Sequence, residues 1–301
     1  MTDPTPPITT PSVTQAMIDA YDDYTHVSLD RRSLMARLTA LAGSSAAAYA
    51  VLPLIEANPA HAAIVEHDDP RIDHVDTFWK GAGDTEMRGY FVLPKDAPAE
   101  VPMVMVIHEN RGLTQHIRDV ARRVAVAGFG ALAPDFLSPL CGTPTDEDQA
   151  RELIGKLDRE ETIANGLRSI AFLDRHKRST GKIGAVGFCW GGGMVNALAI
   201  AAGSKLQAAV PYYGPVPGDL SNVRKIRAKM LLQYAGNDER INAGLPAYKK
   251  ALTKARVDWA LHMYQEQQHA FHNDTSPARY NKLVAEQSWR RTIDFFKKHL
   301  D

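Results

Sequence analysis

The chain has 301 residues, of which 45% are hydrophobic and 23% are charged, and these are ordinary proportions for a globular protein. Its 35 Lys and Arg residues balance 35 Asp and Glu residues, so the formal net charge is zero and indicates neither a nucleic acid nor a membrane surface as a partner. The two cysteines, Cys141 and Cys189, are too few for a disulfide framework, and no group of Cys and His has the spacing of a zinc site.

Residues 1–62 differ from the rest of the chain. Residues 1–14 are rich in Pro and Thr and are expected to be disordered. Arg31 and Arg32 precede an Ala/Leu-rich run, and Ala-His-Ala at 60–62 fits a cleavage site, so the segment resembles a twin-arginine export signal. This resemblance implies the export machinery as a partner and the periplasm as the location. The alternative is an N-terminal helix that packs on the body, is never removed, and leaves the protein in the cytoplasm.

The run from Leu38 to Ile55 is a poor membrane span, because Gly, Ser and Pro residues interrupt it. From residue 63 onward, strand-like and helix-like segments alternate. Residues 71–79 and 86–94 alternate enough to form a β-hairpin at one edge of a sheet. The continuous apolar run 101–109 predicts a strand that is covered on both faces.

The segments that follow repeat the same alternation. Strands are predicted at 129–135, 182–188, 207–214, 229–238 and 258–266, and helices at 114–128, at 145–176 as a pair, at 193–200, at 243–255 and at 277–299. Strands that alternate with helices predict parallel crossover units and a doubly wound, mostly parallel α/β sheet. Since no linker interrupts 63–301, this region is predicted to be one domain.

One short stretch carries the clearest chemical signal. Gly187-Phe188-Cys189-Trp190-Gly191 stands where a strand turns into a helix, and it is a G-x-C-x-G version of the nucleophile elbow. Glycines are needed there because a side chain at either flank would clash in so sharp a turn. A buried structural thiol is the commoner fate of a single cysteine. In this setting we favour a nucleophile, placed at a helix N-terminus whose dipole stabilises a thiolate.

Two further loops follow strands in the order expected for an acid and a base. Asp238 ends the strand at 229–238, and His269 follows the strand at 258–266. Taken alone, Asp238 is a turn residue and His269 a surface or capping residue. The order nucleophile, acid, histidine is nevertheless that of the α/β-hydrolases, with each residue on its own strand-end loop. The three loops therefore predict a shared catalytic site.

The sequence resembles the dienelactone hydrolase family of α/β-hydrolases, whose nucleophile is a cysteine, over essentially all of 72–299. The resemblance is carried by the stretches at 107–110, 132–136, 181–192, 236–239 and 269–273. It implies the α/β-hydrolase fold and a Cys189–Asp238–His269 triad. It also implies that Glu109 holds the resting thiol until substrate displaces it. For Glu109 the alternative is a salt bridge to Arg111 or Arg118.

The chemistry that these roles imply is hydrolysis of an ester or lactone. His269 takes the thiol proton, Asp238 fixes the imidazole, and the Cys189 thiolate attacks the carbonyl carbon to form a thioester that water then hydrolyses. The oxyanion needs backbone N–H donors, which are expected from Trp190 and, by the resemblance, from Asn110. No metal, nucleotide or organic cofactor is required, and the expected partner is a small-molecule substrate.

At two positions this sequence lacks the arginines with which the family binds a substrate carboxylate. Members that act on dienelactone hold the substrate carboxylate with arginines, one of them four residues past the catalytic histidine. Asn273 stands at that position here, and Asp148 falls at the apparent match of the other arginine, with Arg151 close by. A neutral ester, another lactone or an acyl thioester therefore fits as well as a carboxylate-bearing lactone. Four aromatic residues are candidates for an apolar pocket or for plain core: Phe136, Trp190, Tyr212 and Tyr213.

Two other function classes stay open at this point. One is a redox protein in which Cys141 and Cys189 form a reversible disulfide, although Cys141 is interpreted as a bystander. The other is a non-catalytic α/β-hydrolase that only binds its ligand. The sequence does not determine the natural substrate or the oligomeric state.

Overall fold

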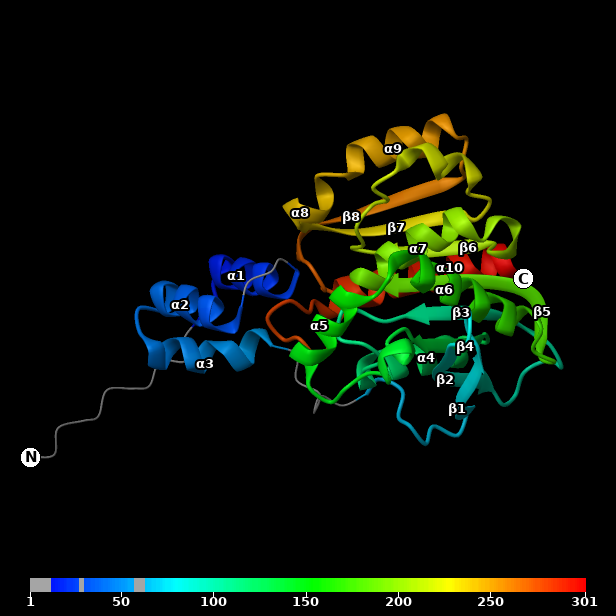
Figure 1. Cartoon of the computed structure of the whole chain (residues 1–301), viewed down its shortest axis with the longest axis horizontal. Helices are drawn as coiled ribbons and strands as arrows, with labels where there is room; N and C mark the ends of the chain where they lie inside the picture. Colours follow the sequence, from blue (N-terminus) through cyan, green and yellow to red (C-terminus); the bar gives the residue numbers. More distant parts are fainter. Residues whose placement is uncertain (1–11, 27–29, 57–62) are drawn as a thin grey trace, which may run out of the picture. The chain divides into compact units, whose positions relative to one another are not determined.

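The computed structural model describes residues 12–26, 30–56 and 63–301, which divide into two compact units (Figure 1). Among the described residues, the first unit comprises 12–26, 30–56 and 273–280, and the second comprises 63–272 and 281–301. The first unit therefore contains the N-terminal helices and, packed with them, a short segment from near the other end of the chain.

The second unit is built on an eight-stranded sheet with the order β1-β2-β4-β3-β5-β6-β7-β8 (Figure 1). β1 pairs with β2 and β2 with β4 in antiparallel fashion, and all the remaining pairs are parallel. The strands are β1 (Ile72–Lys80), β2 (Glu86–Pro94), β3 (Val101–Ile107), β4 (Gly130–Asp135), β5 (Ser179–Phe188), β6 (Ala208–Tyr212), β7 (Lys229–Asn237) and β8 (Trp259–Gln268). The predicted hairpin, the edge position and the mostly parallel α/β sheet are confirmed.

Helices cover both faces of this sheet, as the near-continuous apolar strands require. Apolar residues of α4 and α10 pack on one face, and those of α6, α7 and α9 pack on the other. The α-helices of the second unit are α4 (Gln115–Val126), α5 (Glu147–Lys156), α6 (Arg159–Asp174), α7 (Trp190–Ala201), α8 (Glu239–Asn242), α9 (Leu245–Lys254) and α10 (Lys282–Leu300). Short 3₁₀ turns lie at Ser138–Leu140, Gly203–Lys205 and Leu220–Lys225.

β3 contributes apolar side chains to the core on both faces of the sheet. Val104 and Val106 belong to the core on the α4/α10 side, whereas Met103, Met105 and Ile107 belong to the core on the α6/α7/α9 side. All five side chains are fully buried. Side chains of a strand alternate between the two faces, so this run without any polar residue is what a strand in the middle of a three-layer fold needs.

The last helix begins later than its pattern predicts. The prediction places it at 277–299, but α10 starts at Lys282 after Asn281, whose side-chain oxygen accepts a hydrogen bond from the Val284 N–H. The five residues of difference fall largely in 273–280, a segment that packs with the helices of the first unit. Contacts distant in the sequence therefore override the local helical spacing.

The first unit contains α1 (Gln15–His26), α2 (Arg31–Ala42) and α3 (Ser45–Ile55). Each helix contributes apolar side chains to one cluster, in which Tyr24, Leu34, Leu38, Val51 and Ile55 are at most 1% exposed. Asp30 caps α2 by accepting from Ser33 N, and Ser44 caps α3 by accepting from Ala47 N. These caps satisfy amide groups that a helix start otherwise leaves unpaired.

Segment 273–280 is tied to these helices by polar contacts. Arg279 Nη1 lies 3.1 Å from Asp22 Oδ1, and the Arg279 guanidinium lies 5.2 Å from the centre of the Tyr21 ring. Ser276 Oγ donates to the Ile55 carbonyl oxygen at 3.3 Å. A buried cation needs such partners, because removing a charge from water is costly unless it is paired.

The export signal stays a prediction. Residues 1–11 and the Ala-His-Ala motif at 60–62 lie outside the described residues, while Arg31 and Arg32 are exposed at the start of α2. Within the described part of the chain, no single helix has the length and apolar character needed to cross a membrane; α2 and α3 pass that test only together, with a bend of 110° between them.

Replacing Arg279 by Met removes the cation of the first unit's polar cluster and keeps most of its apolar stem. Since the Asp22 carboxylate then loses its buried cation, we expect the first unit to lose about 3 kcal/mol of stability. Hydrogen exchange measured by mass spectrometry should show faster exchange in α1.

Arg37→Met is the matched control, because Arg37 and Asp23 form an ion pair whose side chains are 50% and 47% exposed. An exposed ion pair contributes less than about 1 kcal/mol to stability, so the hydrogen-exchange rates of α1 should hardly change in this variant. Equal exchange rates in the two variants would contradict the structural role of Arg279.

Candidate active site

Cys189 sits at a sharp reversal of the chain between β5 and α7. Its backbone has φ 55° and ψ −116°, a conformation that is strained for any residue with a side chain. Two backbone hydrogen bonds hold it: Cys189 N donates to the Tyr212 carbonyl at 3.1 Å, and Gly193 N donates to the Cys189 carbonyl at 3.1 Å. The turn predicted from the glycines is therefore present.

The glycines around Cys189 are required by close backbone contacts. A Cβ at Gly191 would lie 2.4 Å from the carbonyl oxygen of His108, just after β3. A Cβ at Gly192 would lie 2.5 Å from the carbonyl oxygen of Tyr212, at the end of β6. Such distances exclude any side chain, so the first turn of α7 fits between the ends of the two strands that flank β5 only because these residues are glycine.

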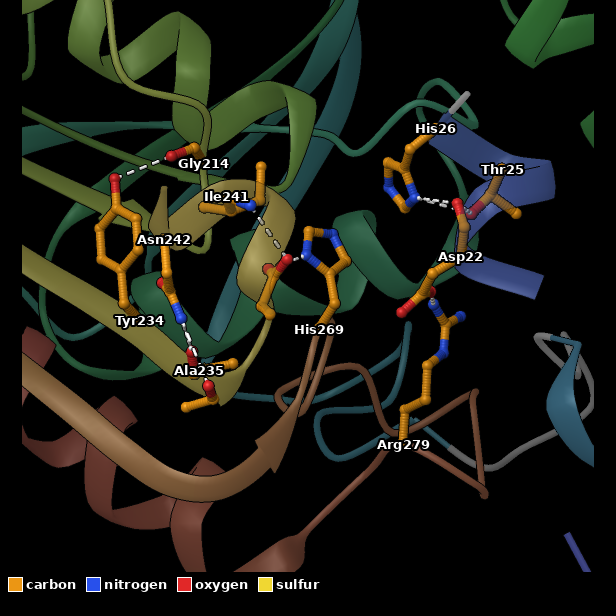
Figure 2. A network of polar contacts seen from close by, with 12 residues as sticks. Asp22, Thr25, His26, Gly214, Tyr234, Ala235, Ile241, Asn242, His269 and Arg279 are labelled. Atoms are coloured by element: carbon orange, nitrogen blue, oxygen red, sulfur yellow. Dashed lines mark hydrogen bonds and ion pairs between the residues drawn. The ribbon is translucent and has the colours of Figure 1, made fainter. Parts of the chain in front are cut away.

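Asp238 and His269 come together at the ends of β7 and β8. His269 Nδ1 and Asp238 Oδ2 are 2.6 Å apart, and both side chains are buried. Figure 2 shows His269 with Ile241 and Asn242 of α8, and dashed lines mark their hydrogen bonds. The second oxygen of Asp238 accepts from the Ile241 N–H at 3.3 Å, so that Asp238 also caps α8. Asn242 in turn donates to the Ala235 carbonyl at 2.8 Å, which ties α8 back to β7. The carboxylate is thus fixed from two sides.

Cys189 lies beside this pair. Its sulfur is within 4.8 Å of a ring nitrogen of His269, and the residue is only 4% exposed. The Tyr213 ring, whose centre is 4.9 Å from that of His269, covers the imidazole from another side. The structure therefore brings the three residues that the sequence singled out to one edge of the sheet, although they are 49 and 31 positions apart in the chain.

The surroundings of His269 favour its charged form. Burial by itself lowers the pKa of His269, but the charges of Asp238 and Cys189 and hydrogen bonds to the same two groups raise the pKa to about 10. An imidazole in this position holds its proton between a carboxylate and a sulfur. This is the arrangement in which a histidine can pass a proton to or from an acyl-transfer reaction.

The residues after β3 form the third side of the site. Glu109 and Asn110 are half-buried in the loop that follows Ile107, next to the first turn of α7. Arg111 forms an ion pair with Glu147 at 2.6 Å, and the Arg118 guanidinium lies 2.6 Å from an oxygen of Asp76. The role of Glu109 stays a prediction.

His108, in the same loop, has a role that its sequence pattern does not indicate. It is fully buried, its Nε2 accepts from the Phe136 N–H at 3.1 Å, and its Nδ1 lies 2.6 Å from the Glu109 carbonyl oxygen. Since Nε2 accepts, the proton is on Nδ1 and is donated to that carbonyl. Burial lowers the pKa of His108, in keeping with a neutral ring. The only signal in the sequence was its place beside Glu109.

Of the four aromatic residues near the strand ends, three belong to the core and one, Trp190, lines a pocket. Phe136, Tyr212 and Tyr213 are at most 1% exposed and belong to the core. Trp190 is half-buried, stacks on His108 with 5.2 Å between ring centres, and lines a cavity of about 260 Å³. Gly193, Met194 and Pro215 are among its other walls. A mostly apolar cavity therefore adjoins the helix that begins directly after Cys189.

A sequence profile described as "Dienelactone hydrolase family" matches residues 87–300, which is more than half of the chain. The chain belongs to the dienelactone hydrolase family. It is accordingly a hydrolase, and the eight-stranded sheet with helices on both faces is the α/β-hydrolase fold of that family.

Relatives of the family support this membership. The Escherichia coli (strain K12) protein "Putative carboxymethylenebutenolidase" is 30% identical over 257 residues, covering 81% of this chain and 93% of its own length. Among solved structures, "Putative Dienelactone Hydrolase" from Klebsiella pneumoniae superposes with a TM-score of 0.69 at 27% identity and covers 76% of this chain and 99% of that one. A "Dienelactone Hydrolase-like Promiscuous Phospotriesterase P91" from metagenomic libraries, 22% identical, shares the fold with a TM-score of 0.71 over 77% of this chain and 100% of that one.

The raised pKa of His269 predicts how stability depends on pH. Below the ordinary histidine value of 6.5 the ring is protonated in both the folded and the unfolded chain, so the stabilisation is fully present. As the pH rises towards about 10, the unfolded chain loses this proton first and the folded protein keeps it, so the free energy of unfolding should fall.

Asp238→Asn removes the charge that raises this pKa most, so the fall in stability between pH 6.5 and 10 should be smaller in the variant. Urea unfolding followed by circular dichroism across this range provides the measurement for both proteins. If the free energy of unfolding fell with pH equally in the wild-type protein and in Asp238→Asn, Asp238 would not be the group that holds the proton on His269.

Proposed function

We propose that this member of the dienelactone hydrolase family hydrolyses a carboxylic ester or lactone through a thiolate of Cys189, with His269 as acid and base and Asp238 as its orienting partner. The observation that carries the proposal is the buried His269–Asp238 contact of 2.6 Å beside the Cys189 sulfur, which stands in a strained strand-to-helix turn. Strain at a reactive residue persists where the surrounding structure holds it, as close glycine contacts do here.

The first half of the reaction acylates the enzyme. The His269 imidazole takes the thiol proton, and the thiolate forms a C–S bond to the carbonyl carbon while the carbonyl π electrons move to oxygen. Collapse of this tetrahedral species breaks the bond from carbon to the leaving oxygen, which takes the proton from His269. An ester releases its alcohol at this point, whereas the new hydroxyl of a lactone stays attached to the acyl group.

The second half frees the enzyme. His269 takes a proton from water, the hydroxide oxygen attacks the thioester carbon, and breakage of the C–S bond returns the thiolate and leaves a carboxylic acid. Asp238 keeps the proton-bearing Nδ1 directed at its own oxygen throughout and stabilises the imidazolium that forms twice. Burial of both groups strengthens this interaction relative to water.

The oxyanion in both halves is stabilised by two backbone N–H groups, those of Trp190 and Asn110. The close contact of Gly191 with the His108 carbonyl supports the pairing, because it brings the start of α7 against the loop that carries Asn110. Loss of one such donor typically raises the barrier by about 2.7–4 kcal/mol.

His108 acts in this proposal as a positioning residue. A peptide unit is planar, and its C=O and N–H point in opposite directions. His108 Nδ1 holds the Glu109 carbonyl, which belongs to the same peptide unit as the Asn110 N–H. Fixing that carbonyl therefore fixes the direction of the Asn110 donor. The stacked Trp190 ring and the Phe136 N–H keep the His108 ring in place.

The substrate is proposed to be an ester, lactone or thioester whose acyl or alcohol part is largely apolar. Arg151 lies 3.8 Å from Asp148 and Arg111 lies 2.6 Å from Glu147, so both arginines near the apparent carboxylate position already face an acid. The cavity beside Trp190 is mostly apolar, with Arg159 and Thr162 also in its lining, and it supports a substrate with a large apolar part. The name of the Escherichia coli relative leaves a carboxylate-bearing lactone as the alternative.

Two observations bear on the other function classes. Cys141 is exposed, Cys189 is buried, and neither forms a disulfide, which supports a hydrolase over a protein that cycles a disulfide. A ring nitrogen of His269 beside the sulfur supports catalysis over binding alone, because binding does not need a base next to a nucleophile.

Export to the periplasm is the proposed location, with retention in the cytoplasm as the alternative. Burial of Leu34, Leu38 and Ile55 inside the first unit supports the alternative, because cleavage before Ala63 would remove this entire cluster. The intact mass of the protein made in its own host separates the two: a start at Ala63 supports removal, and a start near Met1 supports retention.

Cys189→Ala should abolish turnover of an activated aryl ester, with kcat/KM at least about 10³-fold lower, because the variant has no nucleophile. Cys141→Ala is the matched control and should leave the rate unchanged. Release of the phenol, followed by absorbance, is the measurement. Wild-type rates in Cys189→Ala would refute the proposal.

His108 is tested by two substitutions that each preserve one of its contacts. The amide nitrogen of Asn overlays Nδ1 and can still donate to the Glu109 carbonyl, whereas Gln reaches the place of Nε2 but not that of Nδ1. We expect His108→Gln to lower kcat about tenfold or more with little change in KM, and His108→Asn to recover part of that loss.

A purely structural role of His108 predicts a different result. Both variants would then lose thermal stability and activity together, with no preference for Asn over Gln. Steady-state kinetics and thermal unfolding of the same preparations separate the two outcomes.

A further inference from the structure

A second cavity of the sheet unit is lined by basic and aromatic side chains. It has a volume of about 580 Å³ and lies between the end of β1 and one face of α6, and we call it the basic groove. Its aromatic residues are Trp79 and Phe172, and its cations are Lys80, Arg168, Arg175 and Lys177. A volume of this size suits a small-molecule ligand. None of these residues belongs to the candidate active site.

The cations of the basic groove lack acidic partners. Among the residues that the structure describes, no acid lines the groove, and none of the four cations makes an ion pair or a side-chain hydrogen bond. The nearby Asp174 lies 3.0 Å from Lys205 and is engaged there. The formal net charge of the whole chain is zero, so this concentration of one sign is a local feature. It attracts anions.

The helix dipole accounts for only part of this arrangement. Arg175 and Lys177 follow the C-terminal end of α6, where cations stabilise the partial negative charge. Arg168 lies two turns earlier in α6, and Lys80 ends a strand. Residues 168, 172 and 175 are spaced by four and three positions, so they share one helix face. Two of the four cations therefore need another explanation.

The aromatic wall adds a second and independent observation. The Trp79 ring stacks on Phe172, with 5.1 Å between ring centres and 25° between ring planes. Both residues line the cavity, Trp79 with 8% of its surface exposed and Phe172 half-buried. The cationic cavity therefore has an aromatic wall against which a flat ring can lie.

We propose that the basic groove binds a small polyanion that carries a flat aromatic ring, of the chemical type of a nucleoside diphosphate. The guanidinium groups of Arg168 and Arg175 and the amines of Lys80 and Lys177 bind the phosphate oxygens, for which arginine offers two parallel donors. The ring lies against Trp79 and Phe172. The binding is independent of ester hydrolysis.

His176 provides a reporter inside the groove. It lines the cavity, and burial lowers its pKa, with the charges of Lys177 and Arg178 lowering it further. A bound polyanion offsets these positive charges, so the pKa of His176 should rise when the groove is occupied.

The test titrates the full-length protein with ADP by calorimetry and NMR. ADP should bind, shift the Trp79 indole N–H resonance and raise the pKa of His176. Adenosine carries the ring without the charge, and pyrophosphate carries the charge without the ring, so both should bind at least about tenfold more weakly. Absence of ADP binding would overturn the proposal, and pyrophosphate binding as tight as that of ADP would overturn the proposed ligand class.

Charge-matched double variants locate the site. Arg168→Gln with Arg175→Gln should weaken ADP binding at least about tenfold and leave ester hydrolysis unchanged. Lys249→Gln with Lys250→Gln removes the same charge from exposed positions on α9 and should leave ADP binding unchanged. If both double variants lost ADP affinity equally, or if the first lost none, the anion would bind elsewhere and the proposed binding in the basic groove would be refuted.

Discussion

The backbone of Cys189 is the constraint on which the rest of the site depends. With φ at 55° the chain reverses within one residue, so the sulfur stands at the edge of the sheet and α7 starts immediately after it. That reversal is held by contacts that leave no room for a Cβ: Gly191 lies against the loop after β3, and Gly192 lies against the end of β6. The same contacts bring the ends of three neighbouring strands together around the sulfur.

Two buried histidines of the second unit show that the charge of a buried ring depends on whether its partners offset the effect of burial. His269 faces a carboxylate and a sulfur, and its pKa is raised to about 10. His108 faces a peptide N–H and a peptide carbonyl, and burial lowers its pKa. Environments that separate the pKa values of two like groups are a common way of assigning different tasks. In the proposed mechanism the first ring moves protons and the second holds a peptide unit in place.

The sequence predicts those features that local chemistry determines. Glycines that flank Cys189 predict the elbow, because only that residue type fits such a turn, and the apolar run before Glu109 predicts a strand that is buried on both faces. The start of α10 was predicted five residues too early, since the segment before it packs with helices more than two hundred residues away in the chain. Helical spacing carries no information on such contacts.

Features built from distant residues are equally invisible in the sequence. The task of His108 depends on the backbone groups it contacts, and the basic groove combines the end of β1 with a face of α6 about ninety residues later. Neither leaves a pattern of spacing that a reader of the sequence can recognise. The loops that carry Cys189, Asp238 and His269 can be predicted from the sequence, because the order of these residues along the chain is typical of α/β-hydrolases.

In the proposed mechanism an acyl group passes through the sulfur of Cys189. This step is tested most directly by mixing the protein with an activated aryl ester, quenching in acid within the first turnover, and mapping the tryptic peptides by mass spectrometry. We expect the added acyl mass on the peptide 183–205, which contains Cys189, and none on the peptide 124–151, which contains Cys141. Turnover with no acyl adduct on 183–205 at any quench time, or an adduct on another residue that forms and decays at the turnover rate, would contradict the proposed mechanism.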